Sequence, residues 1–257
     1  MQALSLPASS GWRWLSEGFR LLRKSHAMLT LLVISYWMLM VFVSLIPVIG
    51  TIIGTLCIPA FSVSLMNACQ SIDRGGPVGL RLLFSGFASH LRPLLILGAI
   101  YLVATLGILG LSSLFDDGVL MRMILTGRKP PEEALRDGSL LKALQIALAL
   151  LAPLMMAYWY APALTGWHGL PPGKSLFFSF VACARNWRAF MVYGLGLVGI
   201  VTALMLLIGI FTMLLPGLSG LSATVSTMLI ALVLAPTIFA SFYVSYRDVF
   251  VSNASQA

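Results

Sequence analysis

Four stretches of this chain contain no Asp, Glu, Lys or Arg, and they constrain its fold more than any other feature. They cover residues 25–72, 93–115, 143–167 and 189–246. A helix needs about 20 mostly apolar residues to cross the ~30 Å hydrocarbon core of a membrane. Only 9% of the 257 residues are charged, against about 25% in soluble domains. The chain is therefore expected to be an all-α integral membrane protein.

The first and last charge-free stretches are too long for a single crossing. Each contains a short break, at residues 47–50 and at Pro216-Gly217, so each is predicted to be a helical hairpin. The result is six spans within one membrane domain, residues 1–257. The expected spans are 27–46, 49–69, 93–115, 141–165, 189–214 and 222–245.

The positive charge falls on one side of the predicted membrane. Eleven cations and three acids lie on the side of the N-terminus, whereas five cations and five acids lie on the opposite side. An excess of Lys and Arg marks cytoplasmic loops. Both termini are therefore predicted to be cytoplasmic, with the protein in a bacterial inner membrane. The net charge of +8 then indicates orientation and contact with lipid headgroups, not nucleic-acid binding.

A short amphipathic segment precedes each odd-numbered span, at 11–24, 79–92 and 173–188. Cations beside large apolar residues are typical of a helix in the membrane interface, and packing against the protein's own spans is the alternative. The apolar stripes are Trp12, Leu15, Phe19 and Leu22; then Leu80, Leu83, Phe84, Phe87 and Leu91; then Leu176, Phe180 and Trp187, with Ser179 and Asn186 assigned to the polar side. The cations predicted to contact headgroups are Arg13, Arg20, Arg23, Lys24, Arg81, Arg92, Lys174, Arg185 and Arg188.

These segments align with one another. Gly18-Phe19, Gly86-Phe87 and Ser179-Phe180 occupy the same place, and a cation follows each phenylalanine by five residues. Each even-numbered span then carries an internal proline, which is expected to kink it. The prolines are Pro59, Pro162 and Pro236.

The alignment predicts three parallel repeats, each an interfacial helix followed by a kinked hairpin. Their expected bounds are 11–72, 79–167 with an outer insertion at 116–140, and 173–248. Repeats in membrane proteins often frame a central site. The alternative is that Phe and Arg match by chance near membrane boundaries.

One family resemblance rests on short motifs. Gly11-Trp12-Arg13-Trp14-Leu15 with Gly18-Phe19, followed by Pro47 and the Gly86-Phe87 segment, resembles a family of uncharacterised six-span inner-membrane proteins of beta-proteobacteria. More distantly, the chain is similar to YciC-like proteins and to the membrane domain of some glycerophosphodiester phosphodiesterases. The resemblance implies the fold and the inner-membrane location. It implies no activity and no functional residues.

The sequence offers no chemistry of its own at mid-membrane depth. No Asp, Glu, Lys, Arg or His is expected there, although such residues mark ion paths and proton relays. The histidines His26, His90 and His168 lack the accompanying ligands of a metal site, and the three cysteines are expected to be small packing residues. No catalytic or phosphate-binding motif occurs. A non-enzyme without cofactor or metal is predicted.

Neutral polar residues of the spans either line a cavity or bond neighbouring helices. They are Ser35, Tyr36, Ser62, Ser64, Asn67, Gln145 and Tyr158. Two functions remain open. The first, slightly favoured, is a membrane-embedded partner or organiser that contacts lipid and another membrane protein, the latter through the 116–140 insertion. The second is a transporter or lipid-handling protein that moves a neutral or amphiphilic molecule through a groove between the repeats.

Overall fold

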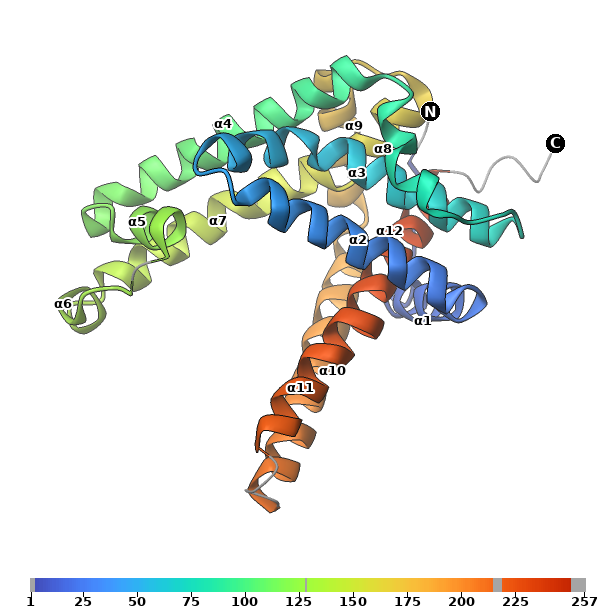
Figure 1. Ribbon diagram of the computed structural model, residues 1–257. Helices are drawn as coiled ribbons and strands as arrows, with labels where there is room; N and C mark the ends of the chain where they lie inside the picture. The colour runs from blue at the N-terminus through green and yellow to red at the C-terminus, as the bar shows by residue number, and fades with distance from the viewer. Residues whose placement is uncertain (1–2, 128, 215–218, 251–257) are drawn as a thin grey trace.

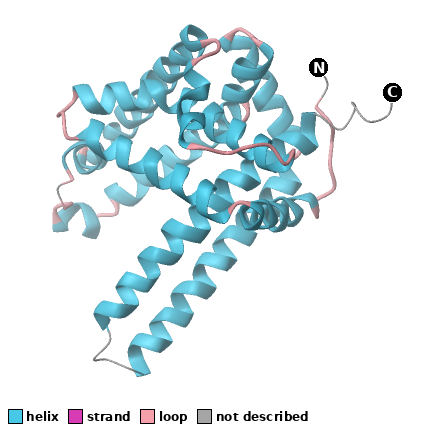
Figure 2. Ribbon diagram, turned by 45° about the vertical axis from the view of Figure 1, so that its right-hand side comes forward, coloured by secondary structure: helices cyan, strands magenta, loops and turns pink. Residues whose placement is uncertain are grey.

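The computed structural model describes residues 3–127, 129–214 and 219–250, and its regular elements in these ranges are all helical (Figures 1 and 2). Six spans are long and apolar enough to cross a membrane, so the six predicted spans are confirmed with ends shifted by a few residues. They are α2 (His26–Ser44), α3 (Ile49–Asp73), α4 (Leu91–Asp116), α7 (Ser139–Trp159) continued by α8 (Ala161–His168), α10 (Trp187–Leu214), and α11 (Ser219–Leu229) continued by the π-helical turn η3 (Ile230–Leu234) and α12 (Ala235–Phe250).

The three prolines of the even-numbered spans are all buried, and two of them lie next to an irregular turn of their span. Pro59 lies inside α3, Pro162 follows the break between α7 and α8, and Pro236 follows the π-helical turn. Proline lacks a backbone N–H and crowds the preceding turn, which accounts for irregular helix at such points. α7 contains a further proline, Pro153, that the repeat pattern does not include.

The first hairpin turns tightly at the predicted break. Val48 has a φ angle of +61°, which is strained for a β-branched residue, and α3 begins at the next residue. The second predicted break, at Pro216-Gly217, lies outside the described residues.

The amphipathic segments form α1 (Ser10–Lys24), the 3₁₀ helix η1 (Leu80–Phe87) and α9 (Pro172–Arg185). On α1 the face that packs on the protein carries Gly11 and Gly18 together with Trp14, whereas Trp12 and Phe19 are 56% and 43% exposed. The predicted stripe of α1 is therefore divided between two faces.

The same division recurs in the other two segments. η1 buries Leu83 and Gly86 and exposes Leu80 and Phe84. α9 buries Ser179 and Ala182, and Asn186 behind it is also buried, while Phe180 and Trp187 are exposed. Assigning Ser179 and Asn186 to the polar, outward side was wrong. Helices in lipid pack closely through small residues, because large apolar side chains lose nothing by facing the hydrocarbon.

The three hairpins project from a compact base. Figure 1 shows α10 and α11 extending away from the other spans, and α4 with α7 extending in another direction. The largest buried cluster lies in the base, where α1, α8, α9 and α12 meet. The N–H of Leu4 donates to the carbonyl of Val249 at 3.0 Å, so the two ends of the described chain are adjacent. We call this end of the molecule, which carries the amphipathic segments, the basic end.

The 116–140 insertion lies at the opposite end, beyond α4 and α7 (Figure 1). It contains α5 (Val119–Thr126) and α6 (Glu132–Arg136). Asp116 accepts hydrogen bonds from the N–H groups of Gly118 at 3.0 Å and Leu120 at 2.6 Å, so its carboxylate bonds an N–H group of the first turn of α5.

Candidate functional site

A cavity of about 370 Å³ lies between the three even-numbered spans, which carry the internal prolines. Pro59 of α3 and Pro162 of α8 both line it, and Phe239 and Phe242 of α12 complete the wall from the third hairpin. Tyr101 of α4 is the contribution of an odd-numbered span. Pro59 and Pro162 thus lie beside the space that spans of all three hairpins leave between them.

The described lining residues present almost only carbon to the cavity. The hydroxyl of Tyr158 donates to the carbonyl of Leu97 at 2.7 Å, and the hydroxyl of Thr55 donates to the carbonyl of Thr51 at 2.8 Å. No lining residue carries a charge. The cavity can therefore accept an apolar group, and an ion would lose its hydration there without compensation.

Two prolines that line the cavity lack a backbone N–H donor. A proline at position i removes the N–H that would bond the carbonyl of residue i−4, which is Thr55 for Pro59 and Tyr158 for Pro162. Both residues line the cavity. The equivalent carbonyl for Pro236 belongs to Leu232, and the hydroxyl of Thr30 donates to it at 3.1 Å. The carbonyl of Thr55 thus loses the helical N–H donor at position 59, and the carbonyl of Tyr158 lies in the last turn of α7, where the helix ends.

Some of the neutral polar residues of the spans line the cavity, and others bond neighbouring helices. Ser62 and Tyr158 line the cavity. Ser64 and Asn67 instead bond neighbouring elements, since Ser64 accepts from the N–H of Gly86 and the oxygen of Asn67 accepts from the indole of Trp167 at 2.7 Å. Of the others, Tyr36 packs its ring on Phe61 and Phe239, and Gln145 is exposed.

An aromatic cluster borders the cavity. Trp159 and Phe242 line the cavity with ring centroids 5.4 Å apart, and both rings also belong to this cluster. Behind them Tyr160 is fully buried between Phe190 and Tyr246. The aromatic cluster thus forms one part of the cavity wall.

Gly18, Gly86 and Ser179, which align in the sequence, each make a close contact with a spanning helix. A Cβ atom at Gly86 would overlap the carbonyl oxygen of Ala60 in α3, and one at Gly18 would lie 2.7 Å from the backbone nitrogen of Ser241 in α12. The hydroxyl of Ser179 donates to the carbonyl of Met156 at 2.8 Å, in α7. Each segment thus packs on an even-numbered span of another hairpin: η1 on α3, α9 on α7 and α8, and α1 on α12.

A cluster of ionised groups joins α1, α3 and α12 at the basic end. The guanidinium of Arg247 contacts Glu17 at 2.5 Å, Asp73 at 3.0 Å and Asp248 at 3.3 Å. Arg13 pairs with Asp248 at 2.8 Å, and Lys24 pairs with Asp73 at 3.7 Å. These three carboxylates are the acids that the sequence places on the side of the N-terminus. The cluster was not predicted from the sequence, although the occurrence of only three acids among eleven cations could have indicated it.

A comparison with curated proteins decides the class of the chain. It is 35% identical over 256 residues to a Burkholderia thailandensis protein named as a probable inner membrane protein, and the match covers 97% of this chain and 94% of the relative. The chain belongs to this family of inner-membrane proteins. No model of a protein family and no solved structure matches the chain. The expected links to YciC-like proteins and to phosphodiesterase membrane domains gain no support.

This inner-membrane protein exposes all nine cations that were predicted to meet lipid headgroups. They lie on α1, on η1 and the start of α4, and on α9 and the start of α10, and all nine are exposed. Arg188 stacks over the ring of Trp187 at 5.5 Å. Three of the nine also reach acids, since Arg13, Arg20 and Lys24 form ion pairs. The headgroup role itself stays a prediction.

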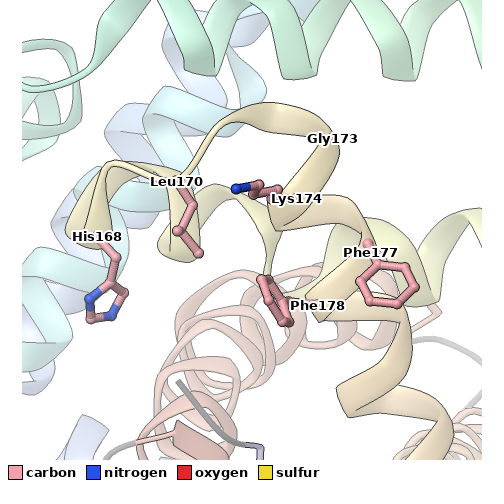
Figure 3. A pocket seen from close by; sticks show the side chains of 6 residues that line it. All are labelled: His168, Leu170, Gly173, Lys174, Phe177 and Phe178. Carbon is pink, nitrogen blue, oxygen red and sulfur yellow. The ribbon is translucent and has the colours of Figure 1, made fainter.

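Figure 3 shows the side chains around one of these cations, Lys174. It lies in the first turn of α9, with Phe177 and Phe178 on the next turn and His168 at the end of α8. These residues border a surface pocket of about 560 Å³, and Phe177 is 64% exposed. Exposed aromatic rings beside a cation suit the boundary between hydrocarbon and water.

The histidines and cysteines of the described ranges do not assemble a metal site. No group of three or more His, Cys, Asp or Glu residues there could hold a metal ion. The ring of His168 is hydrogen-bonded to the hydroxyl of Tyr246 at 2.7 Å. Cys69 and Cys183 are buried as expected of packing residues, and burial raises the pKa of the Cys183 thiol to about 12, which keeps it protonated.

Asn186 fastens the start of the chain to the base. Its buried amide donates to the carbonyls of Leu4 and Ala182 at 2.8 and 2.9 Å, and its oxygen accepts from the N–H of Leu6 at 2.8 Å. Replacing Asn186 by leucine should lower the free energy of unfolding by about 2–3 kcal/mol, because buried backbone groups lose their partners.

Thermal unfolding in mild detergent, with hydrogen exchange of residues 3–9, measures this effect. The matched control is Gln145→Leu, at an exposed amide of α7, which should leave both readings unchanged. Equal stability of the two variants would contradict the assignment.

Proposed function

We propose that the protein is a non-enzymatic inner-membrane protein that binds a neutral or amphiphilic molecule in the cavity between its three even-numbered spans. The observation that carries the proposal is the wall of that cavity, which spans of all three hairpins build around Pro59 and Pro162. Its uncharged lining matches the apolar part of a lipid-like molecule. This ordering reverses the preference drawn from the sequence alone.

The carbonyl of Thr55 narrows the chemistry of the ligand further. It lacks the helical N–H donor that Pro59 removes, so a hydroxyl or amide on an otherwise apolar molecule would find an acceptor there. A buried carboxylate or phosphate would find no cation in the wall. The ligand class is thus an uncharged lipid or similar amphiphile with a hydrogen-bond donor, handled within the membrane.

The orientation proposed with this function puts both termini in the cytoplasm. The support is the eleven cations that the sequence places with the basic end, against the balanced charge of the 116–140 insertion and its flanks. The cavity would then lie among the spans, where molecules can enter from the bilayer.

A substitution pair within one helix tests the cavity. Thr55→Phe places a ring into it, whereas Thr51→Phe adds the same ring one turn earlier, at an exposed position. After extraction directly into lipid nanodiscs, native mass spectrometry should find a retained uncharged small molecule on the wild type and on Thr51→Phe, and no such uncharged molecule on Thr55→Phe. The same ligand occupancy in all three proteins would refute the proposal.

A second candidate function rests on the insertion. Ile124, Leu125 and Leu135 of α5 and α6 are 59–61% exposed, which favours a membrane-protein partner at that end. Deleting residues 117–139 separates the two functions. The cavity proposal expects ligand retention to survive this deletion, whereas the partner proposal expects a co-purifying protein to be lost with it.

A further inference from the structure

A second apolar groove lies on the outside of the base, separate from the central cavity. Trp12 and Phe19 of α1 form one wall, Leu197 and Leu204 of α10 form another, and Val233 of the π-helical turn lies opposite. Its volume is about 380 Å³, and its lining is almost entirely carbon. Leu197 and Leu204 are seven residues apart, so the groove runs for about 10 Å along α10 away from the basic end.

The same face of α1 continues from the apolar wall into cations. Residues four apart lie one above the other on a helix, and Phe19 is followed at this spacing by Arg23, as Ser16 is by Arg20. Both arginines are exposed. Arg20 contacts Glu17 at 3.1 Å, but Glu17 also holds Arg247, and Arg23 has no ion pair within the described ranges. The groove therefore begins beside positive charge that the protein itself balances only in part.

We propose that an acidic phospholipid binds here, with one acyl chain in the groove and its phosphate at Arg20 and Arg23. A carbon-lined channel that starts at cations and runs along a spanning helix has the polarity of a phospholipid. Charge argues against a second copy of this chain as the occupant. The copy would bring the same basic helix to the same place, and the two would repel.

The geometry of the π-helical turn contributes to the groove. η3 interrupts the sixth span where Leu229, Val233 and Leu234 face α1 and α10, and α1 covers this region only through Trp12, Leu15, Ser16 and Phe19. Protein side chains leave the space between these elements open. In a membrane, the surrounding lipid supplies the chain that fills it.

Lipid retention in mixed nanodiscs tests the site. Discs are made with equal parts of phosphatidylglycerol and phosphatidylcholine, and the lipids that stay bound to the released protein are identified by native mass spectrometry. The wild type should retain phosphatidylglycerol over phosphatidylcholine by about tenfold, because each nearby cation strengthens acidic-lipid binding. Arg20→Gln with Arg23→Gln should abolish the preference, and Arg81→Gln with Arg92→Gln should keep it.

A second pair of variants tests the acyl-chain groove. Leu204→Trp fills it, and Leu206→Trp puts the same ring at a position of α10 that is 63% exposed. Only Leu204→Trp should lose the retained lipid. The two arginines are exposed, so their substitution leaves the fold intact. An unchanged preference in the double variant, or equal retention of both lipids by the wild type, would overturn the proposal. Thr55→Phe, in the central cavity, should not change this readout.

Discussion

Replacing Arg247 by methionine is expected to lower the free energy of unfolding by about 2–3 kcal/mol, even though the side chain is only moderately buried. Its guanidinium is one-third exposed, but it is the cation that Glu17, Asp73 and Asp248 share, and these carboxylates are only 11–23% exposed. Removing it leaves three partly buried acids repelling one another. Thermal unfolding in mild detergent should show a markedly lower midpoint.

Two further variants identify the cause of this loss. Arg247→Lys keeps the positive charge but loses the planar fork, so it should recover about half of the stability. Arg81→Met removes an exposed cation of η1 and should change stability by less than about 0.5 kcal/mol. If Arg247→Met were no less stable than Arg81→Met, the cluster would not join α1, α3 and α12 as described.

Gly86→Ala is expected to lower the free energy of unfolding more than the same substitution would on a lipid-facing surface. The new Cβ would overlap the carbonyl oxygen of Ala60, and backbone cannot move aside as a flexible side chain can. The N–H of Gly86 also donates to the hydroxyl of Ser64 at 2.9 Å, and this bond would be strained. We expect a loss of about 2–3 kcal/mol, typical of overpacking.

The control for this prediction uses the same substitution where there is space. Gly107 in α4 has no atom within 4 Å of its Cβ position, so Gly107→Ala should be neutral or slightly stabilising, because alanine favours helix. Gly18→Ala should resemble Gly86→Ala, since it meets the backbone of Ser241. Unfolding midpoints of the three variants measure the difference. A neutral Gly18→Ala and Gly86→Ala would show that the segments do not pack this closely on the spans.

The spans could be predicted from the sequence because the bilayer imposes the rule. Charge is excluded from long stretches, and helix length follows from membrane thickness, so the ends of α2, α3, α4 and α10 were predicted to within about four residues. Each of these features is local in the sequence.

The faces of the amphipathic segments could not be predicted in the same way. Reasoning from hydrophobicity joined Trp12 and Phe19 to Leu15, because in water all three would seek a common core. In a membrane the outward direction is also apolar, so close packing decides which residues face the protein, and Gly18 and Gly86 are the ones that fit. The buried amide of Asn186 was missed for the same reason.

The site depended on contacts between residues far apart in the chain. The prolines indicated where the helices are irregular, but not that Pro59, Pro162 and Phe242 line one cavity. Nor could the sequence show that α1, at the start of the chain, packs on α12 at its end, since the two are more than 200 residues apart. The three acids among many cations indicated an ionic cluster, but only the fold shows that they gather around Arg247.

The most direct test of the central proposal is a cryo-EM map of the protein in nanodiscs made from native membrane lipid. The proposal predicts elongated density between Pro59, Pro162 and Phe242 that the chain does not account for, beside the aromatic cluster of Trp159 and Tyr160. Spans packed together with the protein's own side chains filling this space would contradict it.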